Sequence, residues 1–114
     1  ANGETVGYNI TVTPKGYGGL IEMVVGISDE GRLTDIKILS HTETPGLGAK
    51  AADPAFSGQF HEKIVEKIVV TTTPPAADNE IQAISGATIT SEAVASGVNA
   101  ALGYWAKNLK GEGN

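Results

Sequence analysis

The sequence predicts an α+β fold: an antiparallel β-sheet meander with short helices and a long C-terminal helix packed on the sheet. Two observations lead to this prediction. Near the N-terminus, three segments rich in apolar and β-branched residues are joined by short glycine-containing turns, which is typical of a meander. Toward the C-terminus the apolar spacing changes to three and four residues, which is typical of a helix. The chain has 114 residues, 40% of them hydrophobic, so we expect residues 1–114 to form a single domain around one core.

The predicted meander begins with a strand over residues 4–13, where apolar and polar side chains alternate. Residues 20–27 are apolar almost throughout, which indicates the central strand. Residues 33–39 alternate again and complete the sheet. Glycines in the two connecting segments, residues 14–19 and 29–32, allow the left-handed backbone that tight turns need.

The middle of the chain predicts short and interrupted helices. Residues 49–64 have a helical pattern that Pro54 and Gly58 break, so we expect one or two short helices there. Pro54 suits the first position of a helix, where its missing N–H group costs nothing. Phe56 and Phe60 are four residues apart and are expected to share one face.

Two further elements are predicted after this region. Residues 65–73 are mostly β-branched and favour a strand, which Pro74 would end. Residues 91–109 are expected to form the longest helix, because their apolar residues recur at helical spacing. At a rise of 1.5 Å per residue this helix would be about 27 Å long.

Composition excludes several classes of function. The chain has no cysteine, and its two histidines, His41 and His61, are too few to complete a metal site, so no metal is expected. The formal net charge of −5 argues against a nucleic-acid partner, because such proteins need clustered Lys and Arg. No apolar run approaches the roughly 20 residues of a membrane-spanning helix.

Within residues 85–91, Ser-Gly-Ala-Thr-Ile-Thr-Ser, the last four residues place three hydroxyl groups where the long helix is expected to begin: those of Thr88, Thr90 and Ser91. In one interpretation, Thr90 or Ser91 caps the helix and Gly86 forms the turn before it. In the other, Thr88 accepts a phosphate-containing group, because a helix N-terminus binds phosphate without needing Lys or Arg. A threonine hydroxyl with no base beside it is a weak nucleophile. A separate enzyme would therefore have to activate Thr88, and we expect no catalytic residue in this chain.

Residues 41–48, His-Thr-Glu-Thr-Pro-Gly-Leu-Gly, predict an irregular loop after the third strand. Glycines let backbone N–H groups approach a ligand closely, and the loop also carries polar side chains. The alternative interpretation is an ordinary Pro-Gly turn. The sequence contains neither a Gly-x-Ser-x-Gly nucleophile elbow nor a Walker-type phosphate loop.

Together the two motifs resemble the FMN-binding domain family. This family occurs in the G subunit of the Rnf ion-translocating ferredoxin:NAD oxidoreductase and in the C subunit of the sodium-translocating NADH:quinone reductase. Residues 85–91 resemble the family's flavinylation motif, and residues 41–48 resemble its Glu-Thr-Pro-Gly-Leu-Gly loop. The resemblance covers about residues 4–109, and it departs from the family pattern at Gln82, where an Asp is usual. The shortness of the chain favours the Rnf complex over the quinone reductase.

The resemblance implies that FMN is linked to Thr88 by a phosphoester bond, which a separate flavin transferase forms from FAD. It also implies an electron-transfer domain of a membrane-bound, ion-translocating complex whose other subunits are its partners. The domain would lie on the extracytoplasmic side of an N-terminal anchor that is not in this chain, and it would have no catalytic activity of its own. The cofactor-binding residues implied by the two motifs are Ser85, Gly86, Ala87, Thr88, Thr90, Ser91, His41, Glu43, Thr44, Gly46, Leu47 and Gly48.

Two other functions are also compatible with the sequence. A sensory or regulatory domain of the same fold could hold FMN reversibly without taking part in catalysis. An interaction domain could use residues 85–91 only to begin its helix.

Overall fold

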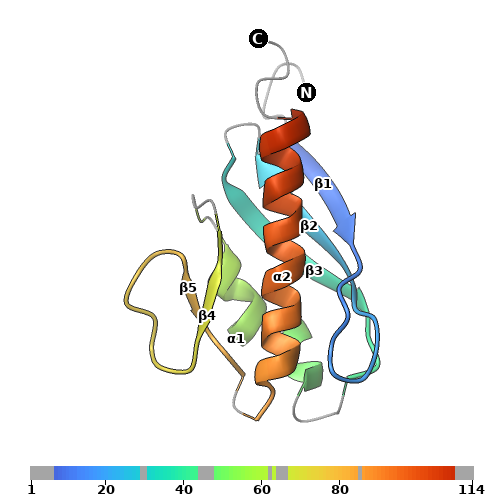
Figure 1. The fold of residues 1–114 in the computed structure, drawn as a ribbon, viewed down its shortest axis with the longest axis vertical. Coiled ribbons are helices and arrows are strands. Elements are labelled where there is room, and N and C mark those ends of the chain that lie inside the picture. The colour runs from blue at the N-terminus through green and yellow to red at the C-terminus, as the bar shows by residue number, and fades with distance from the viewer. Residues whose placement is uncertain are drawn as a thin grey trace.

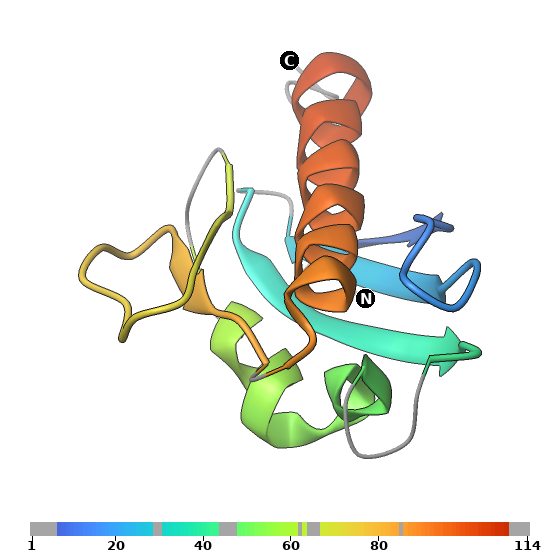
Figure 2. The same ribbon diagram turned by 60° about the horizontal axis from the view of Figure 1, so that its bottom comes forward.

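The computed structural model describes residues 7–28, 31–43, 48–61, 63, 67–84 and 86–109. It confirms the α+β fold, with a three-stranded antiparallel sheet and a long helix, α2 (Thr88–Tyr104), packed against it (Figure 1). The short helices lie beside the third strand of the sheet, as Figure 2 shows.

The sheet is a meander of β1 (Gly7–Val12), β2 (Glu22–Ser28) and β3 (Leu33–Ser40), paired in the order β1-β2-β3. The predicted strands therefore agree with the observed ones to within about two residues, apart from residues 4–6, which lie outside the described part of the chain. The middle strand is the most buried, as expected. Its inward side chains are almost fully inaccessible to solvent: Met23, Val25 and Ile27.

The turn between β2 and β3 depends on a left-handed glycine, as predicted. Gly31 has a φ of +89°, and its N–H group donates a hydrogen bond of 3.0 Å to the Ser28 carbonyl oxygen. A Cβ atom at Gly31 would lie 2.7 Å from the Trp105 ring. This glycine therefore also lets the end of the long helix region pack against the turn.

Three short helices follow the sheet: η1 (Gly48–Ala52), α1 (Pro54–Ser57) and η2 (Gly58–Phe60). The α-helix begins at Pro54, as the sequence predicts, and a 3₁₀ helix begins at Gly58. Phe56 and Phe60 are both buried and meet edge to face, with ring centroids 5.6 Å apart. This pair anchors the short helices in the core.

A two-stranded parallel ladder between β4 (Val69–Thr71) and β5 (Glu80–Gln82) was not predicted. The strand expected over residues 65–73 is only three residues long in the described part, and β5 has the same length. Strands this short are below the length at which alternation can be recognised.

Side-chain amides extend this short ladder. Asn99 of α2 accepts a hydrogen bond from the Ile68 N–H group at 2.6 Å and donates one to the Ile68 carbonyl oxygen at 3.0 Å. Gln59 does the same for Gln82, at 2.7 and 3.0 Å. We call these two pairs the amide brackets; each one supplies the hydrogen bonds that a neighbouring strand would provide.

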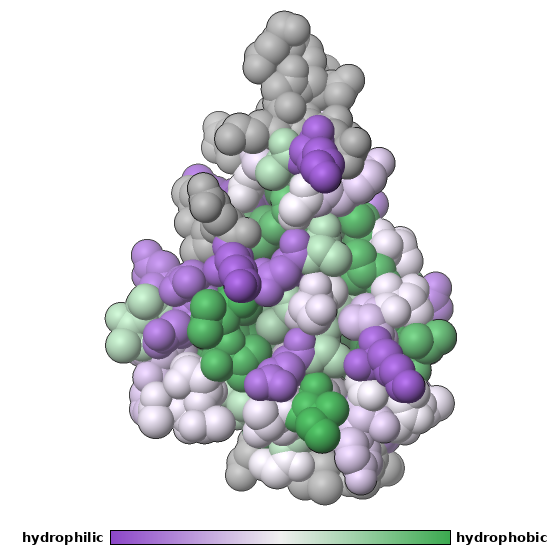
Figure 3. All heavy atoms as spheres, viewed as in Figure 1, coloured by the Kyte–Doolittle hydropathy of each residue, from purple (hydrophilic) through white to green (hydrophobic). Residues whose placement is uncertain are grey.

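Helix α2 begins at Thr88, three residues before the predicted start, and it continues into a π-helical turn, Trp105–Leu109. Its buried face packs on β1 and β2, and it includes small residues as well as large ones. In the described part of the chain, no helix is both long and apolar enough to cross a membrane. On the face shown in Figure 3, apolar residues form small patches separated by hydrophilic ones.

The close approach of α2 to the sheet predicts different effects for two glycine substitutions in one helix. At Gly97 a new Cβ atom would lie within 3.0 to 3.2 Å of Pro14, Val12 and Met23 atoms, whereas at Gly103 it would meet nothing within 4 Å. Gly103→Ala should raise the free energy of unfolding by about 0.5–1 kcal/mol through helix propensity. The free energy of unfolding of Gly97→Ala should lie about 1–3 kcal/mol below that of Gly103→Ala, because the new methyl group overpacks the interface between the helix and the sheet. Urea unfolding of both variants measures the difference, and equal stabilities would contradict the packing described here.

Candidate functional site

A buried carboxylate lies at the point where the sheet, the first long turn and helix α2 meet. Glu43, just beyond the end of β3, has a side chain that is only 5% exposed. Its Oε1 accepts hydrogen bonds from the Tyr17 N–H group at 2.8 Å and from the Thr90 hydroxyl at 2.5 Å. Its Oε2 accepts one from the Gly18 N–H group at 2.8 Å. One side chain thus joins three segments that are far apart in the sequence.

Glycines make room for this carboxylate. A Cβ atom at Gly16 would lie 2.7 Å from Glu43 Oε1, and one at Gly18 would overlap the Thr42 carbonyl oxygen. At Gly48 it would lie 2.6 Å from the Thr90 hydroxyl oxygen. The sequence suggested that Gly48 allows close approach to a ligand; in the structure its missing side chain leaves space for Thr90, so its first role is packing.

The hydrogen bonds keep Glu43 ionised. Burial alone raises the pKa of its carboxyl group, but the bonds from Thr90, Tyr17 and Gly18, together with nearby His41, outweigh burial. The net effect is a pKa below the ordinary value of 4.5. At neutral pH the carboxylate is therefore charged and binds its donors more strongly than a neutral acceptor would.

His41 and Thr42 support the same cluster. The His41 Nδ1 atom accepts a hydrogen bond from the Glu43 N–H group at 3.1 Å, and the Thr42 hydroxyl donates to the Gly18 carbonyl oxygen at 2.9 Å. His41 was expected to contribute to cofactor binding. In the structure it contacts the backbone of Glu43 and is not among the residues that line the cavity described below.

The turn before α2 confirms one part of the helix-start prediction and corrects another. Gly86 has a φ of +76° and forms the turn, as expected. Thr90 and Ser91 do not cap the helix, because the helix begins at Thr88 and both side chains are buried inside its first turn. Thr90 is held by Glu43, 47 residues away in the sequence, which the local pattern could not indicate.

Ser91 fixes the segment that leads into the helix. Its hydroxyl donates a hydrogen bond to the Ala87 carbonyl oxygen and accepts one from the Ile84 N–H group, both at 2.9 Å. Two of the three hydroxyl groups at the helix start are therefore engaged inside the protein.

Thr88 differs from the other two. It is the first residue of α2, its side chain is exposed, and no hydrogen bond to its hydroxyl is found among the described residues. The structure thus leaves one hydroxyl of the three accessible at the N-terminus of the helix, where unpaired N–H groups and the helix dipole favour an anion.

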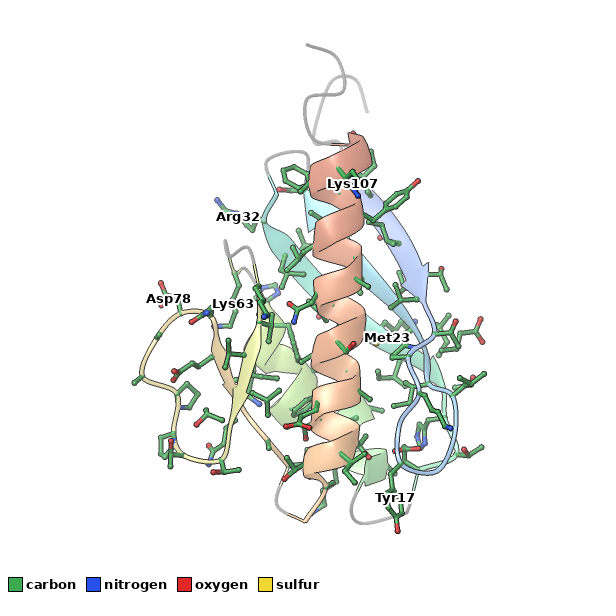
Figure 4. The ribbon with its side chains drawn as sticks, viewed as in Figure 1. Tyr17, Met23, Arg32, Lys63, Asp78 and Lys107 are labelled. Atoms are coloured by element: carbon green, nitrogen blue, oxygen red, sulfur yellow. The ribbon has the colours of Figure 1, made fainter. Side chains whose placement is uncertain are left out.

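A surface cavity of about 500 Å³ opens beside Thr88. This volume lies in the range of about 300–1,000 Å³ that is usual for small-molecule sites. Figure 4 shows Tyr17 at the same end of the molecule as the start of α2. The described residues that line the cavity come from three segments: Tyr17, Gly48, Gly86, Ala87, Thr88, Ile89 and Thr90.

The cavity brings together most of the described residues that the sequence singled out, and it adds two. Five of them line it: Gly48, Gly86, Ala87, Thr88 and Thr90. Ser91 and Glu43 do not line the cavity, but they form hydrogen bonds with two residues that do, Ala87 and Thr90. Tyr17 and Ile89 were missed, although a tyrosine within a glycine-rich turn is a recognisable signal. Four predicted residues lie outside the described part of the chain: Thr44, Gly46, Leu47 and Ser85.

The donor set of the site suits an organic ligand more than a metal. Within the part of the chain that the structure describes, no three His, Asp or Glu side chains come together as metal ligands would. The cavity walls are small or apolar, with hydroxyl groups at the helix start. A flat organic group with a phosphate would match both features.

Comparisons with known proteins point to one family. A family model described as the FMN-binding domain matches residues 16–103. The G subunit of the proton-translocating ferredoxin:NAD(+) oxidoreductase complex of Clostridium ljungdahlii is 44% identical over 99 residues, which cover 87% of this chain and 53% of the relative. The G subunit of the Na(+)-translocating complex of Acetobacterium woodii is 48% identical over 105 residues, covering 90% and 50%. The chain spans about half the length of these curated relatives.

A solved structure has the same fold. The C subunit of the Na(+)-translocating NADH-quinone reductase from Parabacteroides distasonis superposes with a TM-score of 0.75 at 25% identity. The match covers 89% of this chain and 55% of that one.

The hydrogen bonds of Glu43 predict a large effect of a small substitution. In Glu43→Gln one acceptor oxygen becomes an NH₂ group that faces a backbone N–H, and the charge is lost. We expect the free energy of unfolding at pH 7 to fall by about 1–3 kcal/mol, the usual cost of leaving a buried donor unsatisfied. The matched control is Glu92→Gln on the exposed face of α2, which should change little. Equal effects of the two substitutions in urea unfolding would contradict the role of Glu43.

The lowered pKa of Glu43 also predicts how this contribution depends on pH. Because the folded-state pKa lies below the unfolded value of 4.5, the ionised carboxylate stabilises the fold above pH 4.5. That contribution should be lost as the pH falls below 4.5 through the folded-state pKa. The stability difference between the wild type and Glu43→Gln should therefore shrink in acid. Unfolding curves between pH 7 and pH 3 test this, and a difference that grows on acidification would be inconsistent with it.

Proposed function

The chain belongs to the FMN-binding domain family, and from this premise we propose that it is an electron-transfer domain whose FMN is linked through its phosphate to Thr88. One observation supports this proposal most directly. Of the three hydroxyl groups at the start of α2, that of Thr88 alone is both exposed and free of hydrogen bonds to described residues, and it opens into the cavity.

The residues around Thr88 fit a phosphoester of FMN. The first turn of α2 presents backbone N–H groups that have no acceptor within the helix, and these would stabilise the negatively charged phosphate. Gly86 and Ala87 are small and leave the hydroxyl open to a modifying enzyme. The hydrophobic and aromatic parts of the cavity, contributed by Ile89 and Tyr17, are suited to the flavin ring.

Attachment requires a separate flavin transferase and FAD. The Thr88 oxygen would form a bond to the phosphorus of the FMN half of FAD, the pyrophosphate bond would break, and AMP would leave. The hydroxyl proton would pass to a base of the transferase, because none of the described residues that line the cavity is a carboxylate, histidine or lysine. The chain itself would thus be the acceptor, with no catalytic residue of its own.

The division of work between cofactor and protein follows from this arrangement. Once bound, FMN supplies the chemistry of accepting and donating electrons. The chain's residues fix the phosphate end at the helix start and leave the cavity open to the surface, where a neighbouring carrier can approach. A covalent link removes the need for tight non-covalent binding, so a shallow site is sufficient.

We place the chain in a membrane-bound, ion-translocating ferredoxin:NAD oxidoreductase complex of the Rnf type. The support is the 44% and 48% identity to two G subunits, compared with 25% to the C subunit of the quinone reductase. Its partners would be the other subunits of that complex and the flavin transferase, and the domain would lie on the extracytoplasmic side of the membrane. His41 and Glu43 would act by supporting the site; Ser85, Thr44, Gly46 and Leu47 are included on the family resemblance alone.

Co-expression with a flavin transferase tests the covalent link. The intact mass of the wild type should increase by the mass of FMN less one water, and the yellow colour should remain with the denatured protein. Thr88→Ala should abolish the adduct, whereas Thr88→Ser, which keeps a hydroxyl, should retain part of it.

Two outcomes would count against the proposal. An adduct that persists in Thr88→Ala would place the link elsewhere. A colour that is released when the wild type is denatured would favour the alternative of a domain that holds FMN reversibly.

A further inference from the structure

Tyr17 combines strong exposure with a firmly held backbone. Its side chain is 71% exposed, more than any other large hydrophobic or aromatic residue that the structure describes. Among the described residues that line the cavity beside Thr88, it is also the only aromatic one. An aromatic ring left in water gains nothing for folding, so its position at the cavity needs another explanation.

The loop that presents Tyr17 is fixed from beneath. The N–H groups of Tyr17 and Gly18 bind the two oxygens of the buried Glu43 carboxylate, and the Gly16 N–H group donates to the Gly19 carbonyl oxygen at 2.7 Å. The Thr42 hydroxyl holds the Gly18 carbonyl oxygen. The ring is therefore exposed because a tied backbone presents it at the surface.

The same bonds occupy Glu43 itself. Its two carboxylate oxygens already accept three hydrogen bonds, and its side chain is almost completely buried. The family resemblance suggested that Glu43 is a cofactor-binding residue. In this geometry Glu43 faces the loop and Thr90, and it is absent from the residues that line the cavity.

We propose that Tyr17 is the aromatic wall against which the flavin ring packs, and that Glu43 is a positioning residue that acts on the ring by holding Tyr17 and does not contact it. This inference rests on the proposed function and deepens it. The link at Thr88 would secure the phosphate end of the cofactor, and Tyr17 would order the ring end. Flat aromatic groups pack favourably beyond the effect of their buried area, which suits a flavin beside a phenol ring.

The test uses the flavinylated protein and two optical signals. A tyrosine in contact with a flavin quenches its fluorescence by electron donation, and a packed ring is shielded from iodide in solution. In the wild type, the flavin fluorescence should be weak and the flavin ring should be shielded from iodide. In Tyr17→Ala, the flavin fluorescence should be stronger and iodide should reach the flavin ring. In Tyr17→Phe, the fluorescence should also be stronger, but the ring should stay shielded, because phenylalanine packs against it without quenching.

The control Tyr104→Ala removes an exposed tyrosine that lies 16 residues further along α2 than Thr88, about 24 Å away. Its flavin fluorescence and iodide access should match those of the wild type.

Glu43→Gln separates positioning from simple loss of stability. In conditions where the variant is folded, iodide should reach its flavin more easily than in the wild type. Adding Glu43→Gln to Tyr17→Ala should then change little, since the two residues act on the ring through one contact. Additive effects would assign Glu43 a separate role and overturn that half of the proposal.

A separate titration distinguishes failure of the proposed role of Tyr17 from failure of the covalent link at Thr88. In the Thr88→Ala protein, titration with free FMN should show binding about threefold to tenfold weaker when Tyr17→Ala is added, as expected for loss of one aromatic contact. Unchanged affinity there, or unchanged fluorescence and iodide access in flavinylated Tyr17→Ala, would overturn the role of Tyr17. A folded Tyr17→Ala protein that the transferase cannot flavinylate would also overturn it, because Tyr17 would then serve recognition by that enzyme.

Discussion

The hydrogen bonds to the buried Glu43 carboxylate are the constraint on which the cavity depends. Moving a charge out of water is costly, and here the cost is offset by donors from Tyr17, Gly18 and Thr90. These donors lie 26, 25 and 47 residues from Glu43 in the sequence. If one of them moved, the buried charge would lose one of its three hydrogen bonds, so the loop, the end of the sheet and the start of the helix are held in one arrangement.

This constraint also explains why the hydroxyl groups at the start of α2 have different environments. Thr90 points inward because the carboxylate requires a donor, and Ser91 bonds to the backbone of the preceding turn. Thr88, at the very start of the helix, points to solvent and remains available for chemistry. An accessible hydroxyl group thus lies beside two hydroxyl groups that are fully engaged in hydrogen bonds within the protein. Selectivity for Thr88 follows from access, and it needs no difference in the intrinsic reactivity of the three groups.

The features of the fold that depend on local patterns could be predicted from the sequence. The meander, the left-handed glycine at Gly31 and the long helix follow from periodicity and backbone freedom. The start of α2 was placed three residues late, because Thr90 and Ser91 look like caps when their long-range partners are unknown. The parallel ladder was missed since its strands have three residues each. Tyr17 was not assigned to the site because its glycine-rich turn indicates an exposed ring but does not indicate that Glu43, 26 residues away, would fix the loop.

The amide brackets of Asn99 and Gln59 have a consequence for how the domain tolerates change. They replace strand neighbours with single side chains at Ile68, just before β4, and at Gln82, the last residue of β5, so the ladder is held on both sides of the loop that joins its two strands. The cavity beside Thr88 draws none of its lining residues from that segment. Lengthening or shortening the β4–β5 loop during evolution would therefore alter the outline of the domain and leave the cavity beside Thr88 in place.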